Sequence, residues 1–216
     1  MTTIAVLGGT GHEGYGLALR WARAGHSIVI GSRDAAKAQT AAAEINARLG
    51  VQTVSGAANI EAAATADVVC LTIPFGAHAA TLESIKSAVQ GKVFIDVTVP
   101  LMPPKVTRVH MPPAGSASQE AQLILGESVK VVTAFQNIGA EHLQDPDHPI
   151  DCDVLVCGDD KDAKAQVIQL AADAGMKALD AGPLANAVVV EGLTSVLIGL
   201  NIRHKVKNTG IKITGI

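Results

Sequence analysis

Apolar residues occur along this chain in short continuous runs, and the segments between the runs repeat their apolar positions with a helical period. Such runs predict strands buried on both faces, and the helical segments predict connections that cover a parallel sheet. The first run is Ile4–Leu7, followed by a glycine-rich turn, an expected helix over 17–24 and a second strand over 27–30. The first 30 residues therefore predict the start of an α/β fold.

The same alternation continues to about residue 179 and predicts a Rossmann-like, doubly wound parallel sheet. Asp34 and Gly50 bracket an alanine-rich helix as N-cap and stop, and the segment Gly158-Asp159-Asp160 is expected to cap another helix. Further strands are expected near 51–54, 67–73, 92–97, 129–135, 154–157 and 176–179, and helices over 35–49, 59–66, 77–89, 119–125 and 161–174.

A long apolar helix is expected from Leu184 to about Lys205, after a break at 180–183. Polar residues interrupt it, Glu191 among them, so we interpret it as a buried helix of a soluble protein rather than a membrane span. The chain is therefore divided into a Rossmann-like domain, 1–182, and a small helical C-terminal subdomain, 183–216. The subdomain either covers the cleft or forms a homodimer, and the alternating tail 210–216 is expected to pack against the protein.

The turn after the first strand matches the dinucleotide fingerprint G-x-G-x-x-G over residues 9–14. Gly9 is expected to form the tight turn, Gly11 to let the backbone approach a pyrophosphate, and Gly14 to let the helix pack on the strand. The helix N-terminus presents free N–H groups to the anion. Because a strand precedes the motif and a helix follows it, a dinucleotide site is favoured over a glycine turn that binds nothing.

The end of the second strand predicts which dinucleotide binds. NAD-binding domains place an Asp or Glu there for the ribose hydroxyl, whereas an Arg can hold a 2′-phosphate. Here the strand ends in Ser32 and Arg33, with Lys37 one helical turn later. A hydroxyl and two cations suit a phosphate dianion, which indicates NADP(H). The alternative is that Arg33 and Lys37 are only a solvated surface.

In an open parallel sheet the ligand lies outside the carboxyl ends of the strands. Residues 72–75 and 98–100 follow two such ends, so Ile73, Pro74 and Phe75 are expected to border the nucleotide. A purely structural role in ending the strand is about as consistent with Pro74. The long connection 101–118 contains four prolines, and we interpret it as a lid.

Composition narrows the partners and the chemistry. Charged residues are 17% of the chain, the formal net charge is −3 and no basic run occurs, so neither nucleic acid nor an anionic membrane is expected as a partner. The three cysteines form no C-x-x-C pair and are interpreted as buried reduced thiols of a cytoplasmic protein. His142 and His148 lie in an Asp-rich segment, where a solvated loop is favoured over a metal site. We expect no metal ligands and no catalytic side chain.

Several motifs together resemble the NADP oxidoreductases of the deazaflavin coenzyme F420. The resemblance extends from the first strand to the tail, and the segments 157–160 and 180–184 are its most particular parts. The residues that carry it are Gly8-Gly9-Thr10-Gly11, Gly31-Ser32-Arg33 with Lys37, Leu71-Thr72-Ile73-Pro74, Cys157-Gly158-Asp159-Asp160, Asp180-Ala181-Gly182-Pro183-Leu184, Glu191, Leu193-Thr194 and Gly210-Ile211-Lys212.

The resemblance implies hydride transfer between C4 of the nicotinamide of NADP(H) and C5 of coenzyme F420, an 8-hydroxy-5-deazaflavin. The cofactors carry the electronics of such a transfer, so no acid or base is demanded of the protein. The implied contacts are Thr10, Gly11, His12 and Glu13 in the loop, Ser32, Arg33 and Lys37 at the 2′-phosphate, Phe75 after the fourth strand, Val99, Ile138 and Ala140 near the nicotinamide, and Thr209 and Gly210 near the deazaflavin.

The chain departs from the family pattern at His12, Glu13 and Tyr15, where a small polar, a neutral and a basic residue are more common. The carboxylate of Glu13 would repel a pyrophosphate unless its side chain turns away, and His12 either donates to a phosphate or is a tolerated surface residue. Two other functions remain open. One is the reduction of another acceptor by NADPH, and the other is a non-catalytic NADPH sensor.

Overall fold

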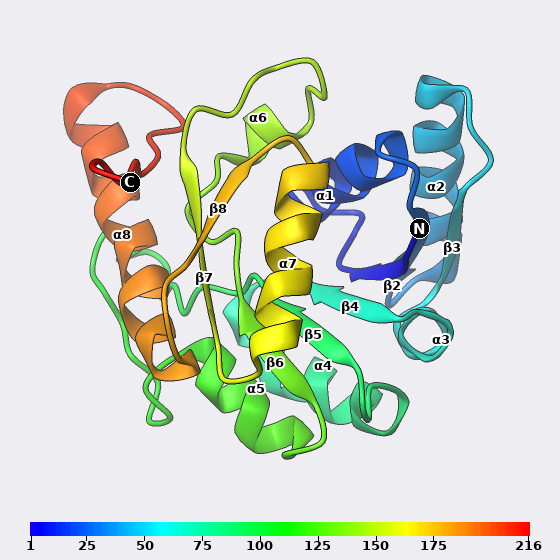
Figure 1. Cartoon of the computed structure of the whole chain (residues 1–216), viewed down its shortest axis with the longest axis horizontal. Helices are drawn as coiled ribbons and strands as arrows, with labels where there is room; N and C mark the ends of the chain where they lie inside the picture. The colour runs from blue at the N-terminus through cyan, green and yellow to red at the C-terminus, as the bar shows by residue number, and fades with distance from the viewer.

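The computed structural model describes all residues, 1–216, and its strands form one eight-stranded sheet (Figure 1). The strand order is β3-β2-β1-β4-β5-β6-β7-β8, as expected for a doubly wound sheet that begins at its centre. The strands are β1 (Thr3–Leu7), β2 (Ser27–Ser32), β3 (Val54–Ala58), β4 (Val68–Leu71), β5 (Val93–Asp96), β6 (Lys130–Thr133), β7 (Asp153–Gly158) and β8 (Lys177–Asp180).

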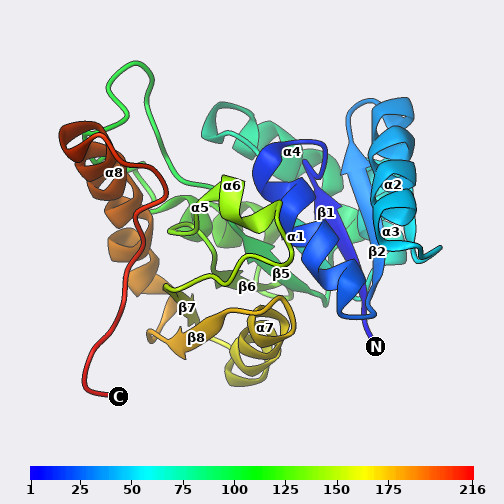
Figure 2. The same cartoon turned by 90° about the horizontal axis from the view of Figure 1, so that it is seen from above.

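Helices cover both faces of the sheet and bury two apolar cores. Alternate residues of β1 separate the cores: Ile4 and Val6 pack with α1, α2 and α7, whereas Ala5 and Leu7 pack with α3, α4 and α5. Figure 2 shows α7 and α4 on opposite sides of the strands. The α-helices are α1 (His12–Arg23), α2 (Ala35–Leu49), α3 (Asn59–Thr65), α4 (His78–Ile85), α5 (Ala117–Leu125), α6 (Ala140–Leu143), α7 (Lys161–Asp173) and α8 (Ala187–His204), with short 3₁₀ turns at Phe75–Ala77, Lys86–Ala88 and Leu184–Asn186.

The expected parallel sheet is confirmed from β3 to β6, but β7 pairs with β6 in the antiparallel direction. The connection between these two strands contains only the four-residue helix α6, and it returns directly to the edge at which β6 ends. A parallel pairing would need a crossover to the opposite edge of the sheet, which is usually made by a long helix. The helix α7 is such a crossover, so β8 runs parallel to β7.

Some expected boundaries are wrong for local reasons. The helix α1 begins at His12 rather than at residue 17, because the extended backbone of Gly11 is already its N-cap. The third strand was expected over 51–54, but β3 begins only at Val54, where the side chain of Asn46 bonds the backbone N–H and C=O. The short helix α6 was missed, and α5 begins two residues earlier than expected.

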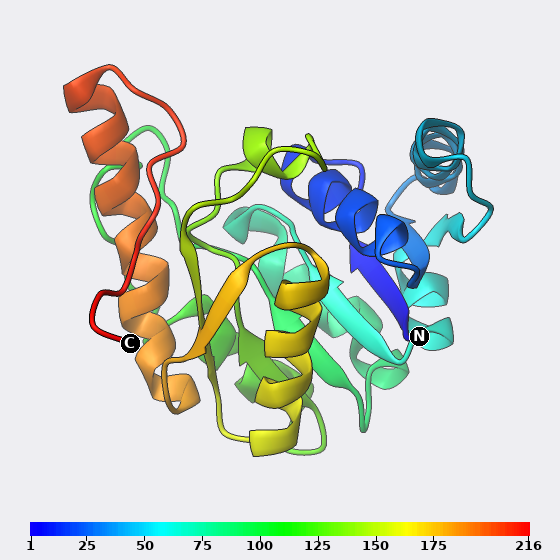
Figure 3. The same cartoon turned by 45° about the horizontal axis from the view of Figure 1, so that its top comes forward.

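The helix α8 lies at the end of the molecule opposite α2 (Figures 1 and 3). The residues from Leu184 to His204 are apolar and numerous enough to cross a membrane by length and composition alone. The expectation that this helix is buried is wrong: only one side packs on the protein, through Glu191 and Ser195 among others, while Val189 is 61% and Val196 48% exposed.

The tail after α8 packs against β7 over part of its length, as expected. The backbone N–H of Asp153 donates to the carbonyl of Ile211 at 2.7 Å, and the side chain of Asp153 accepts the N–H of Ile213 at 2.7 Å. Beyond this point the chain is exposed, with Ile216 at 79%. Packing therefore fixes Gly210 and Ile211 beside the first residues of β7.

Candidate functional site

The glycine loop after β1 turns at Gly8, which has a φ of +83°. A side chain at this position would meet the carbonyl oxygen of Thr72 at 2.8 Å. Gly9 lies in the same turn, as expected: its N–H donates to the carbonyl of Val6 at 3.1 Å, and a Cβ at Gly9 would meet that carbonyl oxygen at 2.8 Å.

Gly11 and Gly14 differ in the space around them. A Cβ at Gly11 would meet only the Gly8 oxygen, at 3.3 Å, so this position is open to an approaching ligand. A Cβ at Gly14 would meet the same oxygen at 2.8 Å and the Cα of Gly9 at 2.9 Å. No side chain caps the N-terminus of α1, so its first N–H groups are free to bind an anion.

A cavity of about 200 Å³ opens at the carboxyl ends of β1, β2 and β4. Six of the predicted site residues line it: Thr10, Gly11, Ser32, Arg33, Ile73 and Pro74. Asn59, Ala77 and Thr81 also line it and were missed. Asn59 directly follows β3, so the rule that ligands lie at the carboxyl ends of strands could have found it.

The charges at this cavity suit a phosphate group. Arg33 and Lys37 are exposed and form no ion pair, although Lys37 lies outside the cavity lining. Asp34 is committed to capping α2, because it accepts the N–H groups of Ala36 at 3.0 Å and Lys37 at 3.4 Å. The hydroxyl oxygen of Ser32 accepts the N–H of Asp34 at 3.2 Å, which leaves its proton free to donate.

The side chain of Glu13 turns into the protein, away from the loop surface. Its Oε1 atom is buried without a hydrogen-bond partner. Burial raises the pKa of this carboxyl to about 8, so it is neutral at pH 7. The expected repulsion of a pyrophosphate therefore does not arise. His12 is exposed on the loop, and its Nδ1 lies 2.9 Å from Nε2 of Gln144.

A second cavity of about 140 Å³ lies between the loop after β6 and the inner side of α8. It brings together Ile138 and Thr209, two of the residues that the resemblance implied. The side chain of Thr209 is held on α8, where its hydroxyl donates to the carbonyl of Leu197 at 3.3 Å. Gly210 is not part of the lining but packs on Cys152. The other lining residues are Gln136, Asn137, Gly139, Thr194, Leu197, Ile198, Asn201 and Asn208.

Three further predicted residues lie outside both cavities. Phe75 packs its ring on His78, with the ring centres 5.8 Å apart, and on His110 at 6.4 Å. Val99 is partly buried after β5, and Ala140 is the first residue of α6.

The rings of His142 and His148 stack with their centres 4.2 Å apart. No group of three His, Cys, Asp or Glu side chains is arranged to hold a metal ion anywhere in the chain. The segment that carries these histidines is bound through its backbone, because their two carbonyls both accept from Nη2 of Arg20 at 2.9 Å.

The glycine loop and its cavity, at the carboxyl edge of a doubly wound sheet, define a dinucleotide-binding protein of the Rossmann class. The family model described as "NADP oxidoreductase coenzyme F420-dependent" matches residues 3–100. The chain belongs to the family of F420-dependent NADP reductases, which full-length similarity establishes.

One relative is the F420-dependent NADP reductase of Methanocaldococcus jannaschii, which is 44% identical over 99% of this chain and 98% of its own. The protein of the same name from Methanothermobacter marburgensis is 45% identical, with the same coverage. Among solved structures, a candidate F420-dependent NADP-reductase from Arthrobacter sp. FB24 aligns with a TM-score of 0.83 and 29% identity, covering 100% of both chains.

Proposed function

We propose that this protein transfers a hydride between NADP(H) and coenzyme F420. One observation carries the proposal: over nearly its whole length the chain is 43–45% identical to three proteins that bear the name F420-dependent NADP reductase. The oxidoreductase class and both cofactors follow from that name. The arrangement of the two cavities supports it.

The glycine-loop cavity is proposed to hold NADP(H). The free N–H groups at the start of α1 would bind the pyrophosphate, and the open face of Gly11 allows close approach. Ser32 and Arg33 would hold the 2′-phosphate, with Lys37 adding charge from α2. These residues fit the group, because both cations are free of carboxylates and Asp34 is occupied as a cap.

The second cavity is proposed to hold the deazaflavin ring. Thr209 lines this cavity, and Ile138, which also lines it, is proposed to contact the nicotinamide together with Val99 and Ala140. We also propose that the dinucleotide-binding domain ends near residue 182 and that residues 183–216 form the subdomain for the second coenzyme, because α8 and the following turn supply one wall of this cavity.

The two cofactors supply the redox chemistry, since a hydride moves directly from one ring carbon to the other. The protein's contribution is position: the reacting carbons must lie about 3–3.5 Å apart in a site that excludes water. The second cavity is lined by three aliphatic side chains, Ile138, Leu197 and Ile198, and otherwise by Gly139 and polar residues. No acid or base from the chain is required.

The reaction is tested by mixing the purified protein with NADPH and oxidised F420 and following the loss of deazaflavin absorbance, with NADH in parallel. We expect rapid bleaching with NADPH and little with NADH. Bleaching that fails while NADPH still binds would contradict the proposed acceptor, and would favour the reduction of another compound or a sensor. Equal rates with both dinucleotides would contradict the 2′-phosphate site.

Replacing Arg33 with alanine is expected to raise the KM for NADPH about tenfold and to leave the KM for NADH nearly unchanged. Hydrogen bonds to a charged group contribute about 1.5–3 kcal/mol, and solvent exposure places Arg33 at the lower end. Steady-state kinetics with each dinucleotide measure the difference. Arg48→Ala, at the other end of α2, is the matched control, and an equal change in both variants would contradict the assignment.

The exposed side of α8 is proposed to be covered by a second copy of the chain, in a homodimer. Val189, Leu193, Val196 and Leu200 recur at helical spacing on this side, and the first and third are 61% and 48% exposed. We expect light scattering to give twice the 22.1 kDa mass of the chain. V196E should reduce this to one chain, and a monomeric wild type would contradict the proposal.

We place the reaction in the cytoplasm. Cys70, Cys152 and Cys157 are all free thiols in the structure. Unpaired cysteines are usual in compartments that keep thiols reduced.

A further inference from the structure

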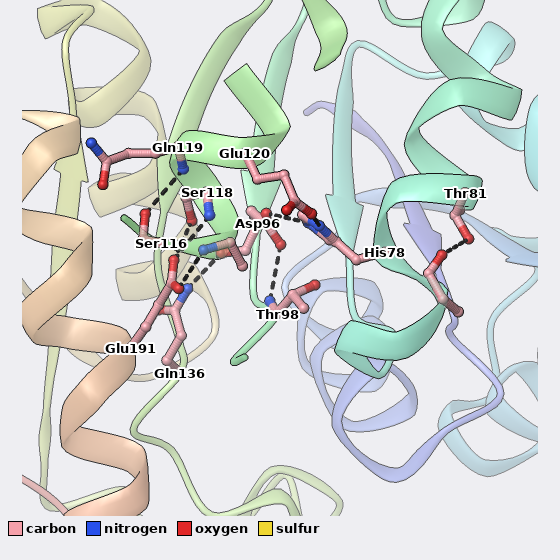
Figure 4. A network of polar contacts seen from close by, with 12 residues as sticks. His78, Thr81, Asp96, Thr98, Ser116, Ser118, Gln119, Glu120, Gln136 and Glu191 are labelled. Atoms are coloured by element: carbon pink, nitrogen blue, oxygen red, sulfur yellow. Dashed lines mark hydrogen bonds and ion pairs between the residues drawn. The ribbon is translucent and has the colours of Figure 1, made fainter. Parts of the chain in front are cut away.

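A buried ion pair lies where the carboxyl ends of β4 and β5 meet. His78, the first residue of α4, and Asp96, the last residue of β5, are both fully buried. The Nε2 atom of His78 lies 2.8 Å from Oδ2 of Asp96, and its Nδ1 atom lies 3.1 Å from Oε1 of Glu120 on α5 (Figure 4). Both ring nitrogens therefore face carboxylate oxygens.

An ionised carboxylate can only accept hydrogen bonds, so this geometry requires His78 to donate from both nitrogens. A histidine that donates twice is an imidazolium. Burial alone lowers the pKa of His78, but hydrogen bonds and charge from Asp96, and then Glu120, raise it to about 9. The ring is therefore a fixed cation held between α4, β5 and α5.

Asp96 connects this cation to both parts of the proposed site. Its Oδ1 accepts the backbone N–H of Thr98 at 3.0 Å, which fixes the chain just before Val99. Its backbone carbonyl accepts Nε2 of Gln136 at 2.6 Å, and Gln136 lines the second cavity. On the other side, the ring of Phe75 lies on His78 at an angle of 30°.

We propose that His78 is a positioning residue for hydride transfer. Its ring holds Asp96 in place, and through Asp96 it holds the loop before Val99 and the wall at Gln136 at a fixed separation. The proposal rests on the proposed function, because the groups so aligned are the nicotinamide and the deazaflavin. His78 itself touches neither cofactor in this scheme.

Other titratable groups lie near the His78–Asp96 pair, and their effects on the pH dependence must be distinguished from that of His78. Glu191 of α8 accepts the N–H groups of Ala117 and Ser118, and burial, together with the charge of Asp96, raises its pKa to about 7 despite these bonds. Glu13 titrates at about 8 because it is buried. On β4, Cys70 is also buried, which raises its pKa well above its usual value. Only a change near pH 9 that depends on residue 78 is therefore attributed to the imidazolium.

The sign of the pH dependence follows from the raised pKa. An unfolded histidine titrates near 6.5, so the contribution of the pair to stability is complete below that pH and is lost as the pH rises through about 9. The alignment should be lost over the same range. We expect the kcat of the wild type to fall above pH 9, and this fall to be absent in H78Q.

The decisive variant is H78Q, compared with H26Q. His26 forms another His–Asp pair, with Asp173 of α7 at 3.0 Å, and lies outside both cavities. For H78Q we expect kcat with NADPH and F420 to fall about 10–100-fold, because a displacement of the reacting groups by about 1 Å lowers the rate by a factor of this size. The Kd for NADPH, measured by its fluorescence, should change less than about threefold. H26Q should retain wild-type kcat.

The proposal is overturned if H78Q and H26Q have the same kcat, or if Kd and kcat change by the same factor in H78Q. If H78Q does not fold, proton NMR of the wild-type protein without cofactors provides the test instead. Two downfield imidazolium N–H signals of His78 that persist to about pH 9 support the proposal, and titration near 6.5 overturns it. Failure of the proposed function is distinguishable, because the wild type itself would then not bleach F420.

Discussion

Replacing Gly14 with alanine is expected to weaken NADPH binding about 100-fold. The added methyl group would collide first with the hydroxyl of Thr72, and it would also meet the Gly8 carbonyl oxygen at 2.8 Å and the Cα of Gly9 at 2.9 Å. The Gly8 and Gly9 atoms belong to the backbone of the glycine loop, so even if the Thr72 side chain turns away, the methyl can be accommodated only if the loop moves away from α1. Overpacking of this kind costs about 1–3 kcal/mol, and here the displaced element is the proposed pyrophosphate site. Fluorescence titration with NADPH measures the loss.

Gly11→Ala separates this packing effect from the loss of space for the ligand. A methyl group at Gly11 meets only one oxygen, at 3.3 Å, so the free protein should keep its melting temperature while NADPH binding falls. The free Gly14→Ala protein should melt at a lower temperature. Unchanged melting together with unchanged affinity in Gly14→Ala would contradict the packing argument.

Replacing Arg20 with methionine is expected to lower the free energy of unfolding by about 3–5 kcal/mol. Arg20 as a whole residue is 5% exposed, and its guanidinium donates to five backbone carbonyls. Those carbonyls belong to His142, Leu143, Asp145, His148 and Ala174, at distances of 2.6–3.1 Å. Methionine keeps the apolar stem but leaves all five carbonyls without this donor, and the carbonyls in the two buried bonds, those of Leu143 and Ala174, then lose a hydrogen bond inside the protein.

Thermal denaturation tests this prediction. A loss of 3–5 kcal/mol in a chain of this length corresponds to about 6–20 °C in melting temperature. The control is Arg23→Met on the same helix, where the arginine forms an exposed ion pair with Asp147 and should contribute less than about 1 kcal/mol. Equal shifts in the two variants would contradict the prediction that the hydrogen bonds of Arg20 stabilise the fold more than the exposed ion pair of Arg23.

Features that depend on neighbouring residues could be predicted from the sequence. Asp34 and Asp160 cap their helices, and Gly50 ends α2 in the left-handed conformation, as expected. The cavity brings Ser32 and Arg33 beside the glycine loop, because adjacent parallel strands end at one edge. Each of these outcomes follows from the chemistry of a few consecutive residues together with one rule of topology.

The remaining features depend on partners far away in the chain. The acceptors of Arg20 lie 122 to 154 positions beyond it and are backbone carbonyls. Because every residue has a backbone carbonyl, the residue types do not indicate which ones accept these hydrogen bonds. The pairing of His78 with Asp96 needs the register of two helices against β5. The inward turn of Glu13 reverses a charge argument that is correct for an exposed carboxylate, because burial makes the group neutral. Such results require the packed structure.

The antiparallel direction of β7 determines the structural role of the segment 157–160, one of the two most particular parts of the family resemblance. Because β7 runs against β6, Cys157–Asp160 leaves the sheet near Lys130, at the opposite edge from the glycine loop. Asp159 accepts the N–H of Leu184 at 2.9 Å, and Asp160 caps α7. The segment 157–160 thus connects the sheet to the C-terminal helical region. Substitutions in this segment are therefore expected to weaken the attachment of the C-terminal helical region without altering the lining of the glycine-loop cavity.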